Sequence, residues 1–280
     1  MITDNQTNKV YFSEWLQKDF PIQYNEIHTI LDRYNISHEL LCHTKDYWCR
    51  DYMPIQIEEN RFIQYRYYPD YLSSNKDAYY ISEPSRICES LGIKTDKTDL
   101  IIDGGNIVKC KDTIVMTEKV FKENPQYTQK QLTSKLEGIF QANFIFLPWD
   151  KKEKYGHSDG IVRYISGDRV LLTNYRDFDS KIADEIIRRL NQCFDVVELN
   201  YTSTLFHNNT WAYINFLQTD NIIIIPKLGI EEDEQAMIQF KALFPEYKEK
   251  IIQIDITPIL KLGGAFNCIS WNIKYNNKRL

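Results

Sequence analysis

The sequence predicts an α/β fold built from five similar modules that close into a ring. The first observation is a set of five short motifs that begin roughly every 52–55 residues along the 280-residue chain. A fixed period in this range is typical of one supersecondary unit used repeatedly. The second observation is that the same order of strand-like and amphipathic runs follows the motifs. The third is that the last unit stops in its hairpin near Asn276, so its helix must come from the N-terminal end.

The five motifs carry most of the chemically distinctive residues of the repeat. In chain order they begin at Trp48 (Trp-Cys-Arg-Asp-Tyr-Met-Pro), Asp103 (Asp-Gly-Gly-Asn-Ile-Val), Gly156 (Gly-His-Ser-Asp-Gly-Ile-Val-Arg), Asn208 (Asn-Asn-Thr-Trp-Ala-Tyr-Ile-Asn-Phe) and Gly263 (Gly-Gly-Ala-Phe-Asn-Cys-Ile-Ser-Trp). In a closed ring, equivalent points of successive modules converge on one axis. Residues far apart in the chain can therefore share one pocket.

The three middle motifs are each followed by a turn, a short aliphatic run, an amphipathic stretch and a second short apolar run. Short β-branched runs predict buried strands, and stretches with apolar residues at helical spacing predict helices. After the second motif we predict a strand at 113–117, a helix at 128–141 and a strand at 144–147. After the third motif the same elements are predicted at 169–173, 180–193 and 194–199. After the fourth motif they are predicted at 221–225, 231–244 and 251–256.

The N-terminal part fits the same order of elements. It predicts a helix at 22–34, a strand at 39–43 before the first motif, and a strand at 61–67 after a turn at 58–60. The unit is thus a strand, a motif strand, a hairpin strand and a helix. Because no Pro/Gly/Ser-rich linker interrupts the chain, we expect one catalytic domain over residues 1–280.

Composition narrows the class of protein. The chain is 43% hydrophobic and 26% charged, as in an ordinary soluble domain, and its net charge of −5 argues against a nucleic-acid partner. Six scattered cysteines without a CxxC pair favour free thiols in a reducing compartment. No apolar signal core opens the chain, and the longest apolar run, 222–226, is too short for a bilayer. We expect a cytoplasmic protein with no membrane partner, and the sequence leaves a homo-oligomer open.

Cys268 and His157 are the candidate reactive residues. A single Cys is usually an inert buried thiol, but the counterparts of Cys268 in other motifs are His and Asp. On a strand of period two, His157 and Asp159 project to the same face. A His and a carboxylate on one face suit acid–base chemistry beside a nucleophile, although a structural hydrogen-bonded pair is the alternative.

Other readings of these residues are weaker. On their own, Asp51 is half of an Arg-Asp charge pair and Asp103 is part of a glycine turn. His157 and Asp159 could offer two metal ligands, with His207 near the fourth motif. However, no His-x-x-x-His or Cys/His spacing is present, so we expect no metal site.

Taken in order, the motifs Trp-x-Arg-Asp-x-x-Pro, Gly-Gly-Asn, Gly-His-x-Asp-x-x-x-Arg, Tyr-x-Asn-Phe and Gly-Gly-x-x-x-Cys resemble the agmatine deiminases. They equally resemble the bacterial-type peptidylarginine deiminases, which belong to the same branch of the pentein superfamily. The resemblance runs from about Trp48 to Trp271, and it implies a five-module α/β propeller with pseudo-fivefold symmetry.

The resemblance also implies roles for individual residues. Cys268 would be the nucleophile and His157 the general acid and base, while Asp51 and Asp159 would hold the planar guanidinium from two sides. The reaction would pass through a covalent thiouronium adduct and need no metal or organic cofactor. The implied substrate-binding residues are Trp48, Asp103, Asn106, Asn215 and Arg66.

The sequence departs from the usual agmatine deiminase pattern at several points. Asn267 stands where a His usually precedes the Cys, and Asp103 stands where a Glu is usual. The far end of the substrate is therefore open. If Arg66 faces the pocket, it would favour arginine or a C-terminal arginine, and otherwise it is a solvated cation at a strand edge.

The leading hypothesis is a hydrolase of linear amidines that converts agmatine to N-carbamoylputrescine and ammonia, or acts on a close arginine derivative. Agmatine would place the protein in putrescine biosynthesis. The alternatives are an arginine or peptidylarginine deiminase, an amidinotransferase, and a non-catalytic pentein that binds a small guanidine compound.

Overall fold

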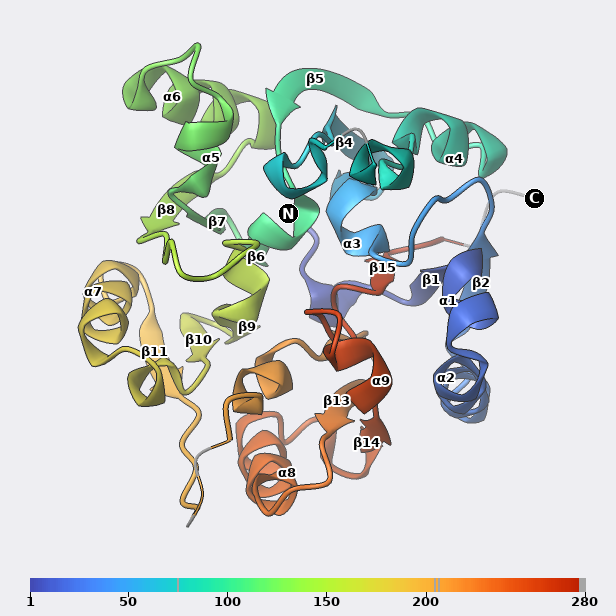
Figure 1. Ribbon diagram of the computed structural model, residues 1–280, viewed down its shortest axis with the longest axis vertical. Coiled ribbons are helices and arrows are strands. Elements are labelled where there is room, and N and C mark those ends of the chain that lie inside the picture. Colours follow the sequence, from blue (N-terminus) through green and yellow to red (C-terminus); the bar gives the residue numbers. More distant parts are fainter. Residues whose placement is uncertain (75, 204, 206, 277–280) are drawn as a thin grey trace.

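Five three-stranded sheets surround a central axis in the computed structural model, which describes residues 1–74, 76–203, 205 and 207–276. The predicted domain end at residue 280 lies outside these residues. The sheets lie nearer the axis, and the longer helices lie on the outer rim of the ring (Figure 1). The predicted fold of five α/β modules is confirmed.

Four of the modules are continuous in sequence. In each, a first strand pairs antiparallel with a second, a helix follows, and a third strand pairs parallel with the second. The helix provides the long crossover that a parallel pair requires. The elements are β3 (Ile55–Glu58), β4 (Arg61–Arg66), α4 (Pro84–Ser90) and β5 (Asp96–Ile101); β6 (Val108–Cys110), β7 (Thr113–Thr117), α6 (Gln129–Phe140) and β8 (Asn143–Leu147); β9 (Val162–Ser166), β10 (Arg169–Leu172), α7 (Ser180–Leu190) and β11 (Asp195–Glu198); and β12 (Leu217–Gln218), β13 (Ile223–Lys227), α8 (Glu232–Leu243) and β14 (Ile251–Asp255).

The fifth module is assembled from both ends of the chain. Strand β15 (Ser270–Ile273) pairs antiparallel with β1 (Lys9–Ser13), and β1 pairs parallel with β2 (Ser37–Leu41). Helix α2 (Pro21–Arg33) connects β1 to β2. The prediction that the last helix comes from the N-terminus is confirmed. The predicted C-terminal hairpin is wrong, because the antiparallel partner of β15 also comes from the N-terminal segment, and this pairing closes the ring.

The predicted strands and helices lie within a few residues of those observed. The predicted helix 180–193 ends three residues too late, since α7 stops at Leu190. Among the strands of the middle modules, the largest offset is at 221–225, since β13 begins only at Ile223. The hydroxyl of Thr219 accepts hydrogen bonds from the backbone nitrogens of Asn221 and Ile222. This local turn delays the start of the strand.

The motifs were predicted to form strands, but only the last residues of the second, third and fifth motifs do so, in β6, β9 and β15. The rest of each motif forms a short turn before the first strand of its sheet, and in the second, third and fifth motifs glycines allow neighbouring groups to approach closely. At Gly104, an added Cβ would lie 2.1 Å from the carbonyl oxygen of Arg50. The turns are α3 (Cys49–Tyr52), η4 (Gly104–Asn106), η5 (Ser158–Gly160) and η7 (Thr210–Ile214), with a non-helical turn at 266–269.

The remaining short elements connect the modules or lie beside them. They are η1 (Asp4–Gln6), α1 (Glu14–Asp19), η2 (Asp70–Leu72), η3 (Asp77–Tyr80), α5 (Lys119–Glu123), η6 (Tyr175–Asp177), η8 (Lys248–Lys250) and α9 (Thr257–Leu260). Within the described part of the chain, none of the helices is long and apolar enough to span a membrane.

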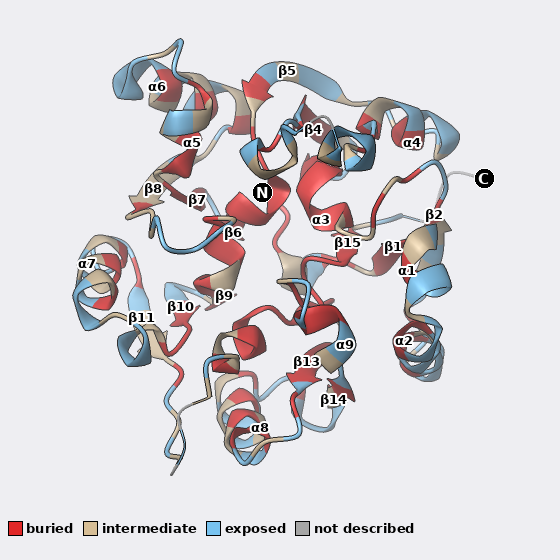
Figure 2. Ribbon diagram, viewed as in Figure 1, coloured by how far each residue is buried: buried red, intermediate tan, exposed pale blue. Residues whose placement is uncertain are grey.

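Buried residues concentrate toward the axis and on the inner sides of the rim helices (Figure 2). Trp271 of β15 is 2% exposed, packs on Tyr11 of β1 and donates a hydrogen bond to the carbonyl of Pro54 at 2.8 Å. On the axis, Asp4 of η1 pairs with Arg163 at 2.9 Å and Lys109 at 3.5 Å. Asp4 thus joins the N-terminal segment to two other modules, and Trp271 joins the fifth module to the first.

Candidate active site

One cavity of about 820 Å³ opens where the motif turns meet. The first motif contributes Trp48 and Asp51, and the third contributes His157 and Asp159. Asn215 and Cys268 complete the set from the fourth and fifth motifs, and the second motif lies behind this lining. The ring thus brings residues from four motifs, more than 200 positions apart in the chain, into one pocket.

Cys268 lies in the turn before β15, at 9% exposure. Its backbone nitrogen donates a hydrogen bond to Oδ1 of Asn215 at 3.2 Å, which fixes the turn from the neighbouring module. Gly264 allows this close packing, because a Cβ there would lie 2.4 Å from the ring of Trp48. The glycine pair before the cysteine therefore has a steric cause. The turn holds the Cys268 sulfur 3.6 Å from Oδ2 of Asp159.

Asp159 is held by amide groups from two other modules. Its Oδ2 accepts hydrogen bonds from Nδ2 of Asn267 at 2.7 Å and from Nδ2 of Asn215 at 3.2 Å. Asn215 therefore orients both the cysteine backbone and the carboxylate beside it. Amide donors can hold a carboxylate in place without neutralising its charge, so Asp159 remains able to pair with a cation.

His157 lies between two carboxylates. Its Nε2 is 3.0 Å from Oδ2 of Asp103, and its Nδ1 is 3.6 Å from Oδ1 of Asp51. Burial alone would lower the pKa of His157, but the charges of Asp51 and Asp103 outweigh burial and raise it to about 9. The imidazole is therefore protonated at neutral pH and can donate a proton.

Asp103 is itself buried against Lys119 of α5, whose Nζ lies 3.2 Å from Oδ2. Burial raises the pKa of Asp103, but the contacts with His157 and Lys119 outweigh it and leave the pKa below its ordinary value. Asp103 thus stays ionised behind His157. Lys119 also pairs with Glu123 at 3.0 Å, so the chain of charges continues away from the pocket.

The resting pocket favours a neutral thiol. Burial, followed by the carboxylates of Asp159 and Asp51, raises the pKa of Cys268 well above its ordinary value. Burial likewise raises the pKa of Asp51 to about 7, with His157 opposing the rise. A cation bound between the two carboxylates would offset both effects, since it favours the charged forms of neighbouring acids.

Comparison with known proteins identifies the family of the chain. The family of Porphyromonas-type peptidyl-arginine deiminases matches residues 16–273 of the chain. The chain belongs to this family. Among curated relatives, a Marinomonas sp. (strain MWYL1) protein described as "Putative agmatine deiminase" is 27% identical over 213 residues, which cover 62% of this chain and 57% of the relative. The chain therefore spans less than two thirds of such relatives in these alignments.

Solved structures show the same fold. The C. jejuni agmatine deiminase superposes with a TM-score of 0.79 at 19% identity, covering 98% of this chain and 95% of that one. The agmatine deiminase of Enterococcus faecalis gives a TM-score of 0.73 at 17% identity, with 96% and 94% covered. The pentein fold expected from the motifs is confirmed.

Against this family background, the structure brings together most of the predicted site residues. Cys268, His157, Asp51, Asp159, Trp48 and Asn215 all line the cavity. The prediction that His157 and Asp159 share one face of a strand is wrong, because they lie at a short helical turn. Both residues nevertheless face the pocket. His157 precedes η5 and Asp159 lies within it, and this turn brings both side chains to the same cavity.

Three predicted substrate-binding residues lie outside the cavity lining. Asp103 is behind His157. The Oδ1 of Asn106 accepts hydrogen bonds from the backbone nitrogens of Thr117 at 2.8 Å and Ser158 at 3.3 Å, so Asn106 joins two modules. Arg66 is exposed, with its guanidinium 5.1 Å from the ring of Tyr68.

The orientation of Arg66 follows from strand alternation. Its neighbour Tyr65 is buried and donates hydrogen bonds to the carbonyl oxygens of Asp51 and Met53 at 2.6 and 2.9 Å. Because successive side chains of β4 point to opposite faces, Arg66 points to solvent. The hypothesis that Arg66 reads a substrate carboxylate is not supported by this placement.

The sequence reasoning missed Asn267, Lys119 and the aromatic wall beside His157. The rings of Tyr71 and Tyr155 lie 6.3 and 6.1 Å from the imidazole, measured between centroids. Tyr71 and Lys119 belong to no motif, so no sequence signal marked them. Asn267 did carry a signal, because it replaces the usual His of the agmatine deiminase pattern.

Proposed function

We propose that this protein is a guanidine deiminase that hydrolyses agmatine or a closely related arginine derivative. The observation that carries the proposal is one pocket in which the thiol of Cys268 lies beside Asp159 and a protonated His157 lies beside Asp51. This set combines a nucleophile, an acid and a cation-binding pair of carboxylates. Family membership supports the same class of reaction.

Binding would begin with the guanidinium between Asp51 and Asp159. The planar cation offers forked N–H donors that two carboxylates can accept from different sides. Its positive charge would lower the pKa of the Cys268 thiol and allow the proton to leave to solvent. The substrate would thus help to form its own nucleophile.

The Cys268 thiolate would then attack the central guanidinium carbon and form a C–S bond. His157 would donate its proton to the departing nitrogen, the C–N bond would break, and ammonia would leave. The resulting thiouronium adduct keeps its carbon bound to sulfur. The neutral His157 would next take a proton from water, whose oxygen attacks this carbon. As the C–S bond breaks and the C=O bond forms, the second proton of that water would leave to solvent, and the thiolate and a ureido product would be released.

The charge of the cavity favours a cationic tail over an anionic one. Seven carboxyl side chains line it, against three lysines and the protonated His157: Asp19, Asp46, Asp51, Asp77, Asp150, Glu153 and Asp159 against Lys45, Lys152, Lys154 and His157. Burial raises the pKa of Asp46 to about 8, so six of these carboxyl groups are left to carry the excess of negative charge. Agmatine ends in an amine, whereas free arginine carries a carboxylate near that end. With Arg66 outside the lining, agmatine is the better match, and it would yield N-carbamoylputrescine.

The first experiment is ammonia release from agmatine, free arginine and a peptide ending in arginine. We expect release from agmatine by the wild-type protein, no release by Cys268→Ala, and normal release by the matched control Cys193→Ala, whose thiol is exposed outside the cavity. Release only from arginine or the peptide would transfer the proposal to the arginine-type deiminases. No release from any of them, but transfer of the amidino group to an added amine, would refute the hydrolase proposal.

A further inference from the structure

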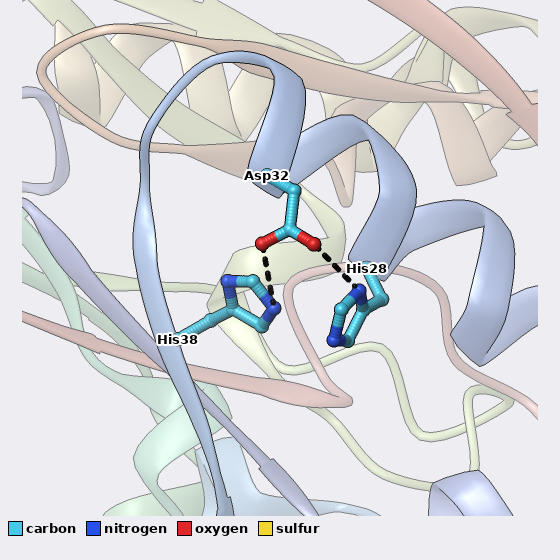
Figure 3. A group of neighbouring side chains, drawn as sticks. All are labelled: His28, Asp32 and His38. Atoms are coloured by element: carbon cyan, nitrogen blue, oxygen red, sulfur yellow. Dashed lines mark ion pairs between the residues drawn. The ribbon is translucent and has the colours of Figure 1, made fainter.

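We propose that His28, Asp32 and His38 form a binding site for a divalent transition-metal ion of the zinc type. His28 and Asp32 lie four residues apart on α2, and His38 projects toward them from β2 (Figure 3). Positions four apart lie on one face of a helix, so the helix presents two ligands together. Imidazole nitrogen and carboxylate oxygen are the donors that zinc accepts alongside thiolates.

The donor atoms have nearly the spacing that a bound ion needs. Nδ1 of His28 is 3.1 Å from Oδ2 of Asp32, and Nε2 of His38 is 3.8 Å from Oδ1 of the same carboxylate. One donor atom from each residue lies within 4.8 Å of the others. Metal–ligand bonds of about 2.0–2.1 Å at tetrahedral angles place donors roughly 3.3 Å apart. Small side-chain rotations would bring all three onto one ion.

The hydrogen bond of His38 prepares its other nitrogen for a metal. Nδ1 of His38 lies 2.9 Å from the carbonyl oxygen of Ile36 and must donate to it. In the neutral imidazole, Nε2 then carries a lone pair, and this lone pair faces a carboxylate. A cation between these two electron-rich groups would be attracted by both. A hydrogen bond from the second ring nitrogen to a backbone carbonyl, as His38 makes, is typical of metal-binding histidines.

The surroundings hold the rings but leave room for solvent ligands. The rings of His28 and His38 meet edge to face, with centroids 4.6 Å apart, and His28 also packs against Tyr24 at 5.8 Å. The His38 side chain is 9% exposed, whereas that of Asp32 is 61% exposed. An ion here would have protein ligands on one side and water on the other.

The site lies on the outer rim, in the module that closes the ring, and none of its three residues lines the catalytic cavity. A bound ion would join α2 to β2 and stabilise the N-terminal contribution to that module. Sequence spacing did not reveal the site, because the third ligand comes from a strand that only the fold places beside the helix. The proposal is independent of the deiminase activity.

The test is a calorimetric titration of Zn²⁺ into the full-length, metal-free protein. Cys42→Ser, Cys193→Ser and Cys268→Ala should be present throughout, since exposed or reactive thiols bind zinc themselves. His38→Gln and Asp32→Asn remove one ligand each. The matched control is His43→Asn, because His43 is exposed, lies outside the cluster and has a φ of 65° that Asn tolerates.

We expect one ion per chain with a Kd of about 1 µM or tighter. Each ligand variant should weaken binding at least about tenfold, and His43→Asn should not. Zinc should also raise the Tm of the parent protein, and at the same zinc concentration raise that of Asp32→Asn less, since stabilisation follows the affinity of a site in the native state. Saturation only near about 1 mM, or equal affinity in both ligand variants and the parent, would overturn the proposal.

Discussion

The replacement Asp103→Asn tests whether the carboxylate behind His157 sets the pH range of the reaction. Asp103 lies 3.0 Å from Nε2 of His157, and Asp51 lies 3.6 Å from Nδ1. At an effective dielectric constant of about 20, these separations correspond to roughly 5.5 and 4.6 kcal/mol of attraction to the imidazolium. Each carboxylate therefore supplies about half of the stabilisation that opposes burial.

The expected effect follows from these magnitudes. The pKa of His157 is raised to about 9, and one pKa unit corresponds to about 1.36 kcal/mol. Loss of the Asp103 charge removes roughly 5.5 kcal/mol of attraction, equivalent to at most about 4 units, while the burial penalty remains, so the pKa should fall by at least about 2 units. His157 must be protonated to release ammonia, so activity at high pH should be lost about 2 units earlier in the variant. Asp51 must be ionised, and its pKa of about 7 should also fall, since Asp103 helps to raise it.

The assay is kcat/KM against pH from about 5.5 to 10, which reports the ionisations of the free enzyme. The wild-type protein should give a bell-shaped curve with limbs near the pKa values of Asp51 and His157. The matched control is Asp70→Asn, which changes a carboxylate 3.5 Å from the same Lys119 without touching His157. A basic limb that stays near pH 9 in Asp103→Asn would refute the assignment of His157 as an acid held by Asp103.

Three further predictions concern single side chains. Asn267→Ala should reduce kcat/KM for agmatine by about 10- to 150-fold, because hydrogen bonds to charged groups contribute about 1.5–3 kcal/mol. Its secondary structure should be normal by circular dichroism. Kinetics equal to those of the wild-type protein would show that the 2.7 Å contact between Asn267 and Asp159 is dispensable. Arg66→Ala should leave kcat/KM for agmatine, free arginine and a peptide ending in arginine within about twofold, and a selective loss with arginine would contradict the outward orientation. His157, with its raised pKa, should contribute about 3 kcal/mol to the free energy of unfolding below pH 6.5, lost as pH rises through about 9. Urea denaturation at pH 6 and 10 should therefore show a smaller loss in His157→Asn than in wild type.

Local patterns of the sequence predicted much of the architecture. The runs at 113–117 and 251–256 became β7 and β14 with almost the same bounds, because strand and helix periodicities depend on neighbouring residues. The order and spacing of the motifs likewise predicted that Cys268, His157, Asp51 and Asp159 share one pocket. Periodicity and motif order are properties of the chain alone, so no coordinates were needed for them.

Other features were decided only when the modules packed together. Asn106 contacts backbone across a module boundary, Asn267 donates to a carboxylate 108 positions away, and β15 pairs with β1 from the opposite end of the chain. No local pattern encodes which partner a buried amide or strand edge will meet. The outward turn of Arg66 and the meeting of His38 with α2 have the same origin. The sequence by itself thus determined the repeated modules and the candidate reactive residues. Tertiary packing decided which groups hold those residues in place, since hydrogen-bond partners are fixed by distance in space and not along the chain.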